Sequence, residues 1–108
     1  MKKALIIIGL LIAAGGASRA ADAKENWNKH CAKCHGADGK GQTRMGKQAG
    51  AKDYTDSKVQ AEIKDENAVK VIKEGLVENG KKKMDPYADK LTDDEIKALV
   101  AHIRQFKK

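Results

Sequence analysis

The residues best suited to chemistry in this 108-residue chain stand together as Cys31-Ala32-Lys33-Cys34-His35. Helical residues three positions apart share one face, so the two thiols would project toward the same bound group. The following residue, His35, adds an imidazole that can bind a metal ion in that group. The spacing therefore predicts two covalent tethers and one metal ligand within a single helical turn.

The pattern C-x-x-C-H is typical of covalent haem attachment, in which both thiols join one edge of the porphyrin and the imidazole binds its iron. A thioredoxin-like dithiol would need a βαβ pattern, which is absent here. A structural zinc site needs four ligands, and beyond the motif only His30 and His102 are candidates. A disulfide suits an oxidising compartment, but so short a loop gains little from closure. We therefore expect Cys31 and Cys34 to carry one haem c and His35 to bind its iron.

A six-coordinate electron carrier needs a second axial ligand opposite His35. Met84 lies far along the chain, before the last predicted helix, so the chain can return around the ring and present the Met84 thioether. Pro86 follows closely and favours extended backbone before it, which suits a ligand loop. Met45 is only ten residues after His35 and could reach the far face only along nearly extended chain. We therefore expect Met84 to be the distal ligand. Packing or solvent contact is expected for His30, and a partly exposed surface position is expected for His102.

Residues 1–20 have the pattern of a secretory signal peptide. Two lysines form a positive head, an apolar run covers residues 4–14, and small residues lead to a cut after Ala20. The apolar run is too short for a spanning helix, which needs about 20 apolar residues. We therefore expect one domain at 21–108, periplasmic after export and without stable membrane insertion.

The composition gives no sign of nucleic-acid binding. Loss of residues 1–20 would reduce the basic residues from 22 to 19 against 15 acidic residues, which leaves a net charge of +4. This mild positive excess is spread over a surface on which basic and acidic residues alternate. We also expect the protein to be a monomer. The mature chain is short and has few aromatic residues, so a large planar cofactor would help to fill its interior. The aromatic residues are Trp27, Tyr54, Tyr87 and Phe106.

The first and last predicted helices are the best defined. The first opens at Asp22, with Glu25 placed to complete a capping box, and Gly36 stops it. Thr92 and Glu95 form a second capping box at the start of the last helix. An apolar stripe along that last helix consists of Ile96, Leu99, Val100, Ile103 and Phe106.

Two shorter helices are predicted between them. One starts at Ser57 with Gln60 as its capping partner, and the other runs from Asn67 to Gly75. The polar stretches 36–56 and 79–90 are predicted to be loops, and no strand pattern is found. The sequence therefore predicts an all-α domain of about four short helices, with long loops wrapped around one covalent haem.

The chain resembles the small class I monohaem cytochromes c of bacteria. The motif C-A-K-C-H, continued by Gly36-Ala37-Asp38-Gly39-Lys40-Gly41, is similar to their haem-binding turn, and the segment from Met84 to Phe106 is similar to their ligand loop and closing helix.

The resemblance implies that Cys31 and Cys34 form the thioethers, that His35 is the proximal ligand and that Met84 is the distal ligand. It also implies that the first and last helices cross beside the haem. Many members have a Pro after the motif whose carbonyl orients the proximal histidine. This chain has no Pro between His35 and Asp85, so the resemblance names no hydrogen-bond partner for His35.

The motif and the resemblance together predict a soluble, non-enzymatic protein that carries single electrons between redox partners. Lys81, Lys82 and Lys83 lie beside Met84 and could steer an acidic partner, although a solvated loop explains them equally well. Three other functions stay open. They are a haem sensor with a free distal position, a peroxidase with distal acid–base groups, and a module of a larger oxidoreductase.

Overall fold

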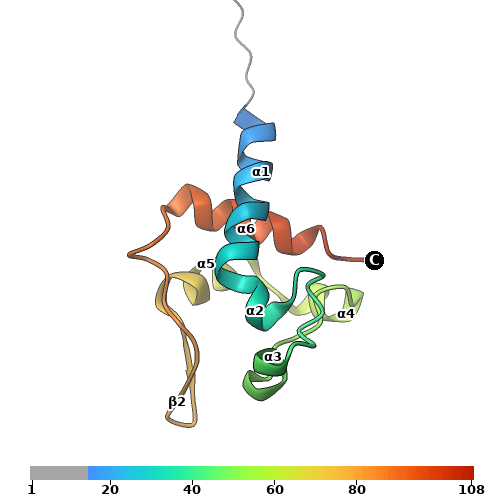
Figure 1. Cartoon of the computed structure of the whole chain (residues 1–108), viewed down its shortest axis with the longest axis vertical. Helices are drawn as coiled ribbons and strands as arrows, with labels where there is room; N and C mark the ends of the chain where they lie inside the picture. Colours follow the sequence, from blue (N-terminus) through green and yellow to red (C-terminus); the bar gives the residue numbers. More distant parts are fainter. Residues whose placement is uncertain (1–14) are drawn as a thin grey trace, which may run out of the picture.

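The computed structural model describes residues 15–108, with side chains from residue 21 onward. Residues 1–14 of the predicted signal peptide lie outside the described part. The first element is α1 (Gly15–Asn26), which continues through one wide π-helical turn, η1 (Trp27–Cys31), into α2 (Ala32–His35). These three elements form one continuous helical rod (Figure 1).

The predicted start of this first helix at Asp22 is wrong, because Asp22 lies within α1. The residues before it include alanines, which favour helix, so the backbone needs no cap at Asp22. The predicted stop is correct, since α2 ends at His35 and Gly36 follows with a positive φ of 81°.

The rest of the described chain contains four further helices and one small sheet. The elements are α3 (Arg44–Ala49), α4 (Ser57–Glu62), α5 (Asp65–Glu74), β1 (Leu76–Glu78), β2 (Lys81–Met84) and α6 (Asp93–Arg104). The two short helices α4 and α5 were predicted, although α4 is capped by Asp56 and α5 begins two residues before the predicted start at Asn67.

The last helix, α6, forms as predicted. The Thr92 side chain accepts a hydrogen bond from the Glu95 backbone N–H, and the Glu95 carboxylate accepts one from the Thr92 backbone N–H. This capping box satisfies two N–H groups that the first turn of a helix leaves without partners. Leu91 and Ile96, which lie on either side of the cap, are both buried in the core.

The core lies where α1 crosses α6 (Figure 1). Trp27, at the start of the wide turn, is almost fully buried, as are Ile96 and Leu99 of α6. Other buried members of this core are Cys31, Ile72, Tyr87, Leu91, Val100 and Ile103. The crossing of the first and last helices therefore places the C-x-x-C-H motif directly against the core.

Residues 79–90 were predicted to be a loop, but Lys81–Met84 within this stretch form the second strand of a β-hairpin. β1 and β2 pair antiparallel, with Glu78 opposite Lys81. Asn79 and Gly80 make the turn with φ values of 53° and 76°. Positive φ at both central residues is the requirement of a type I′ hairpin turn, and Asn-Gly meets it best. The prediction of no strand was therefore wrong for residues 76–84.

The loop predicted over residues 36–56 contains the helix α3. Thr43 caps α3 by accepting a hydrogen bond from the Gly46 backbone N–H, and Gly50 ends the helix with a left-handed φ of 78°. Within residues 15–108, no helix combines the length and the apolar character needed to cross a membrane.

Candidate haem attachment site

The two cysteines lie where the wide turn passes into α2. The Ala32 backbone N–H bonds to the Trp27 carbonyl, one residue further back than in an α-helix. Such π-turns cost regular hydrogen bonding and are frequent at functional sites. Cys31 is 8% exposed, Cys34 is half-buried, and neither forms a disulfide. The disulfide alternative therefore finds no support in this geometry.

Burial raises the pKa of the Cys31 thiol to about 12, and the neighbouring Cys34 adds to the rise. The thiol of Cys31 is therefore protonated at neutral pH. A thioether carries no charge, so an environment that disfavours a thiolate does not disfavour a thioether. The surroundings of Cys31 thus suit a covalently bonded sulfur better than a reactive one.

The short helix α2 is held by the loop that follows it. The Gly36 backbone N–H bonds to the Ala32 carbonyl at 2.7 Å, and the Gly41 backbone N–H bonds to the His35 carbonyl at 2.8 Å. The Trp27 indole N–H donates to the Gly36 carbonyl at 2.9 Å in a buried contact. Because the last carbonyls of a helix otherwise lack partners, these bonds fix the end of the motif.

A hydroxyl group satisfies the two carbonyls in between. Thr43 Oγ1 lies 2.7 Å from the Lys33 carbonyl and 2.8 Å from the Cys34 carbonyl, and its proton is shared between them. The same oxygen accepts the cap hydrogen bond of α3 from Gly46. A Cβ atom at Gly46 would collide with the Cys34 carbonyl, so glycine allows α3 to approach α2 closely. The sequence reasoning missed Thr43 and Gly46, although a Thr three residues before a helical N–H is a recognisable cap.

The imidazole of His35 packs against two aromatic rings, which also contact each other. Its centroid is 5.4 Å from the Trp27 ring and 5.3 Å from the Tyr54 ring. Burial lowers the pKa of His35, so the ring is neutral at neutral pH and keeps a lone pair for a metal. Among the described residues, its Nδ1 atom is buried without a hydrogen-bond partner. A neutral, aromatic-lined imidazole beside two free thiols fits the proximal side of a covalent haem.

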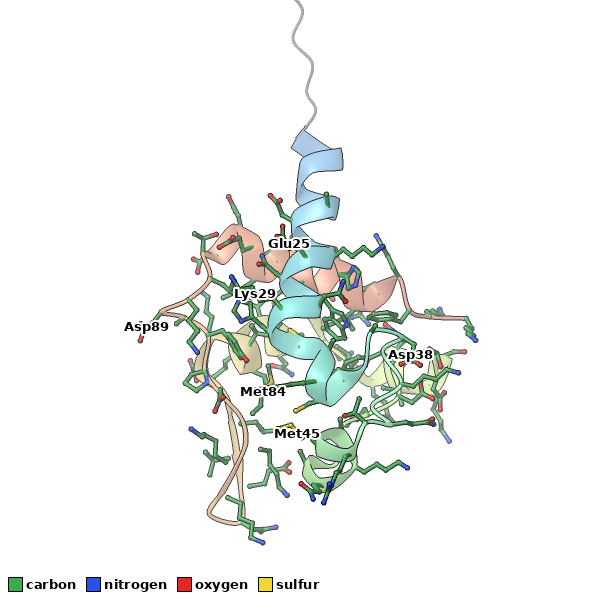
Figure 2. All side chains as sticks on the ribbon, viewed as in Figure 1. Glu25, Lys29, Asp38, Met45, Met84 and Asp89 are labelled. Carbon is green, nitrogen blue, oxygen red and sulfur yellow. The ribbon has the colours of Figure 1, made fainter. Side chains whose placement is uncertain are left out.

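The two methionines of the mature chain differ in burial. Met84 is half-buried at the end of β2 and packs against the hydrophobic core. Met45, on α3, is 47% exposed. In the view of Figure 2, both labelled side chains lie on the side of α2 that faces away from α1. Met84 is therefore the better fixed of the two thioethers.

The backbone around Met84 is anchored to α5. A Cβ atom at Gly75 would lie 2.6 Å from the Met84 carbonyl oxygen, so the end of α5 touches the strand directly. The Tyr87 backbone N–H bonds to the Ile72 carbonyl at 2.9 Å and holds the chain just beyond Met84. These contacts fix the position at which β2 presents its thioether.

The two other histidines are partly exposed, and both contact aromatic rings. His30 meets the Tyr87 ring edge-on at 5.4 Å, and its carbonyl accepts a hydrogen bond from the Tyr87 hydroxyl. His102 lies 5.5 Å from the Trp27 ring and 5.0 Å from the Phe106 ring. Both therefore have packing roles within the fold.

A mostly helical domain with a buried C-x-x-C-H turn defines a c-type cytochrome. A family model described as "Cytochrome C oxidase, cbb3-type, subunit III" matches residues 18–103, and the chain belongs to this cytochrome c family. As a member, it carries covalently bound haem c and takes part in haem-based electron transfer between redox partners.

Solved structures support the same assignment. The structure named KustC0563 c-type cytochrome is 39% identical, with a TM-score of 0.70, and the match covers 81% of this chain and 99% of that chain. A tyrosine-to-phenylalanine variant of Kustc0563 is 40% identical, with a TM-score of 0.70 and coverage of 80% and 99%. No curated protein matches this chain. The predicted small class I cytochrome c fold is confirmed, with α3 and the hairpin as corrections.

Proposed function

We propose that this protein is a single-haem electron carrier with thioethers at Cys31 and Cys34 and axial ligands His35 and Met84. One observation supports this proposal above all others. Two free thiols and a neutral imidazole lie on one turn at the end of the helical rod, against the core. When bound, haem c supplies an iron that alternates between the ferric and ferrous states. The protein's residues hold that group and exclude water from it.

The proposed distal role of Met84 defines the chemistry as electron transfer alone. A thioether on the iron leaves no position for a substrate, and Met/His ligation favours a relatively high reduction potential. The contacts of Gly75 and Tyr87 hold the Met84 strand in place, and a fixed strand would limit the reorganisation that each electron transfer requires. We also propose export to the periplasm after cleavage behind Ala20.

Absorption spectra of the purified holoprotein test this function. We expect low-spin spectra in both redox states and no new absorption bands when carbon monoxide is added to the reduced protein. The physical reason is that both axial positions are already filled by His35 and Met84. Rapid binding of carbon monoxide to the reduced wild-type protein would contradict the carrier function and favour a ligand-binding haem protein.

We propose that the lysines of β2 dock an acidic redox partner. Lys81 and Lys82 are exposed and Lys83 is half-buried, and all three lie on the strand that leads to Met84. Lys82 pairs with Asp85 at 3.1 Å, but both side chains are more than half exposed, so this pair holds the lysine only weakly. A positive strand beside the proposed distal ligand would steer a negative partner toward the haem.

Reversing these three charges is expected to slow electron transfer to a small acidic redox protein about tenfold or more at low salt, because steering contributes roughly 10–10³-fold to such encounters. Stopped-flow rates at several salt concentrations measure the effect, and their salt dependence should weaken. A matched control replaces the exposed Lys24, Lys97 and Lys107 with Glu, which makes the same change in net charge on α1 and at α6. Equal rates for the two triple variants would show that β2 is not the docking strand.

A further inference from the structure

The unsatisfied nitrogen of His35 points to an unusual way of holding the proposed proximal ligand. Histidines that bind metals almost always donate their second ring N–H to an acceptor, which fixes the ring and strengthens the ligand. In this protein Nδ1 of His35 is buried, and no residue within 21–108 accepts from it. The sequence also lacks a Pro between His35 and Asp85. Some other contact must therefore orient the imidazole.

Aromatic packing is the contact that the structure provides. The Tyr54 ring stacks on His35 at a centroid distance of 5.3 Å and an interplanar angle of 25°. The Trp27 ring lies at 5.4 Å and 36°, and the Trp27 and Tyr54 rings meet edge-on at 6.4 Å. Such ring pairs are attractive beyond simple burial. Two of them on one imidazole can therefore take over the orienting role of a single hydrogen bond.

The Trp27 ring is itself held firmly. It is only 2% exposed, and its N–H donates to the Gly36 carbonyl directly after the motif. Phe106 packs against it at 5.1 Å but makes no ring contact with His35. The Trp27 ring therefore has a fixed position against which the His35 imidazole can pack.

The Tyr54 ring is held through its backbone. The Tyr54 N–H bonds to the Gly39 carbonyl at 2.8 Å, and the Tyr54 carbonyl accepts from Gln60 Nε2 at 2.7 Å. Gln60 is 4% exposed and is fixed in turn, because its Nε2 also donates to the Ile103 carbonyl and its Oε1 accepts from Arg104. The Tyr54 ring that stacks on the imidazole is therefore tied to α6.

We infer that Trp27 and Tyr54 are positioning residues that orient the proximal imidazole of His35 by ring packing, in place of a hydrogen bond at Nδ1. This inference rests on the proposed role of His35 as the proximal ligand. Without an acceptor, the imidazole donates less electron density to the iron, so the ferric state is less stabilised and the reduction potential is higher. The two rings thus set the orientation of the ligand, and the missing acceptor at Nδ1 sets its donor strength.

Proton NMR of the reduced wild-type holoprotein tests the inference without any substitution. We expect nuclear Overhauser contacts from the His35 ring to the rings of Trp27 and Tyr54, and an Nδ1 proton without the downfield shift of a strong hydrogen bond. A strongly downfield Nδ1 proton would overturn the inference. If the His35 ring protons lacked the large upfield shift caused by a porphyrin directly above them, the proposed proximal role would fail as well.

Variants at Tyr54 separate ring packing from general stability. Tyr54→Leu removes the ring and should change the pattern of the ferric haem-methyl shifts, which depends on the orientation of the imidazole plane. Tyr54→Phe keeps the ring and should restore the wild-type shift pattern. Phe106→Leu removes a ring from the same cluster that does not touch His35, and it should keep that pattern too. An unchanged pattern in Tyr54→Leu, or the same change in Phe106→Leu, would overturn the inference. If Tyr54→Leu yields no holoprotein, the wild-type spectrum decides.

Discussion

Replacing both Cys31 and Cys34 with alanine is expected to give a secreted polypeptide with no added porphyrin mass and no cooperative unfolding transition. The reason is that both proposed covalent tethers are lost together, and the domain has few aromatic residues with which to build a core of its own. Mass spectrometry and circular dichroism of the secreted protein measure the two effects.

The single variants provide the control for this experiment. Cys31→Ala and Cys34→Ala each leave one tether, so each should retain some covalently bound haem. The mass of the wild-type chain also tests the proposed signal-peptide cleavage, because cleavage after Ala20 makes Ala21 the first residue of the mature protein. Porphyrin mass on the double variant would show that other residues attach the cofactor, and the proposed site would be wrong.

Replacing Met84 with alanine is expected to open the iron. The reduced variant should bind carbon monoxide on mixing, whereas the wild-type protein should not, and the reduction potential should fall because methionine ligation raises it. Truncation of a half-buried Met at a strand that packs against the core should also cost about 2 kcal/mol of stability. Absorption spectra, redox titration and thermal unfolding measure the three effects.

The other methionine of the mature chain gives a matched control. Met45→Ala removes the same thioether from α3, where the side chain is 47% exposed, and should leave the low-spin spectrum in place. If Met45→Ala binds carbon monoxide and Met84→Ala does not, the two assignments must be exchanged. Comparing the two variants therefore decides which sulfur is the distal ligand.

The motif and the last helix could be read from the sequence because their signals are local. The C-x-x-C-H spacing places three groups on one turn whatever surrounds it, and the Thr92–Glu95 box forms from residues only three apart. The crossing of α1 and α6 was expected from the resemblance to the class I cytochromes c, whose first and last helices cross beside the haem.

The missed elements depend on contacts between distant residues. α3 contains Gly46, which disfavours helix by about 1 kcal/mol relative to Ala, and its close approach to the Cys34 carbonyl is visible only in three dimensions. The hairpin has the Asn79-Gly80 turn signal, but the short lysine-rich strand after it shows no alternation of apolar and polar residues. The ring contact between Tyr54 and His35 likewise joins residues from separate segments.

The surroundings of Cys31 determine the order in which this protein can be assembled. In the folded chain the Cys31 sulfur is only 8% exposed, and burial raises the pKa of its thiol to about 12, so both access to the sulfur and formation of the reactive thiolate are disfavoured. The Thr43 hydroxyl bonds to the Lys33 and Cys34 carbonyls at the end of the same turn, and these bonds hold the start of α3 against it. We therefore expect haem attachment to precede folding of the domain. The remaining helices would then pack against the attached haem.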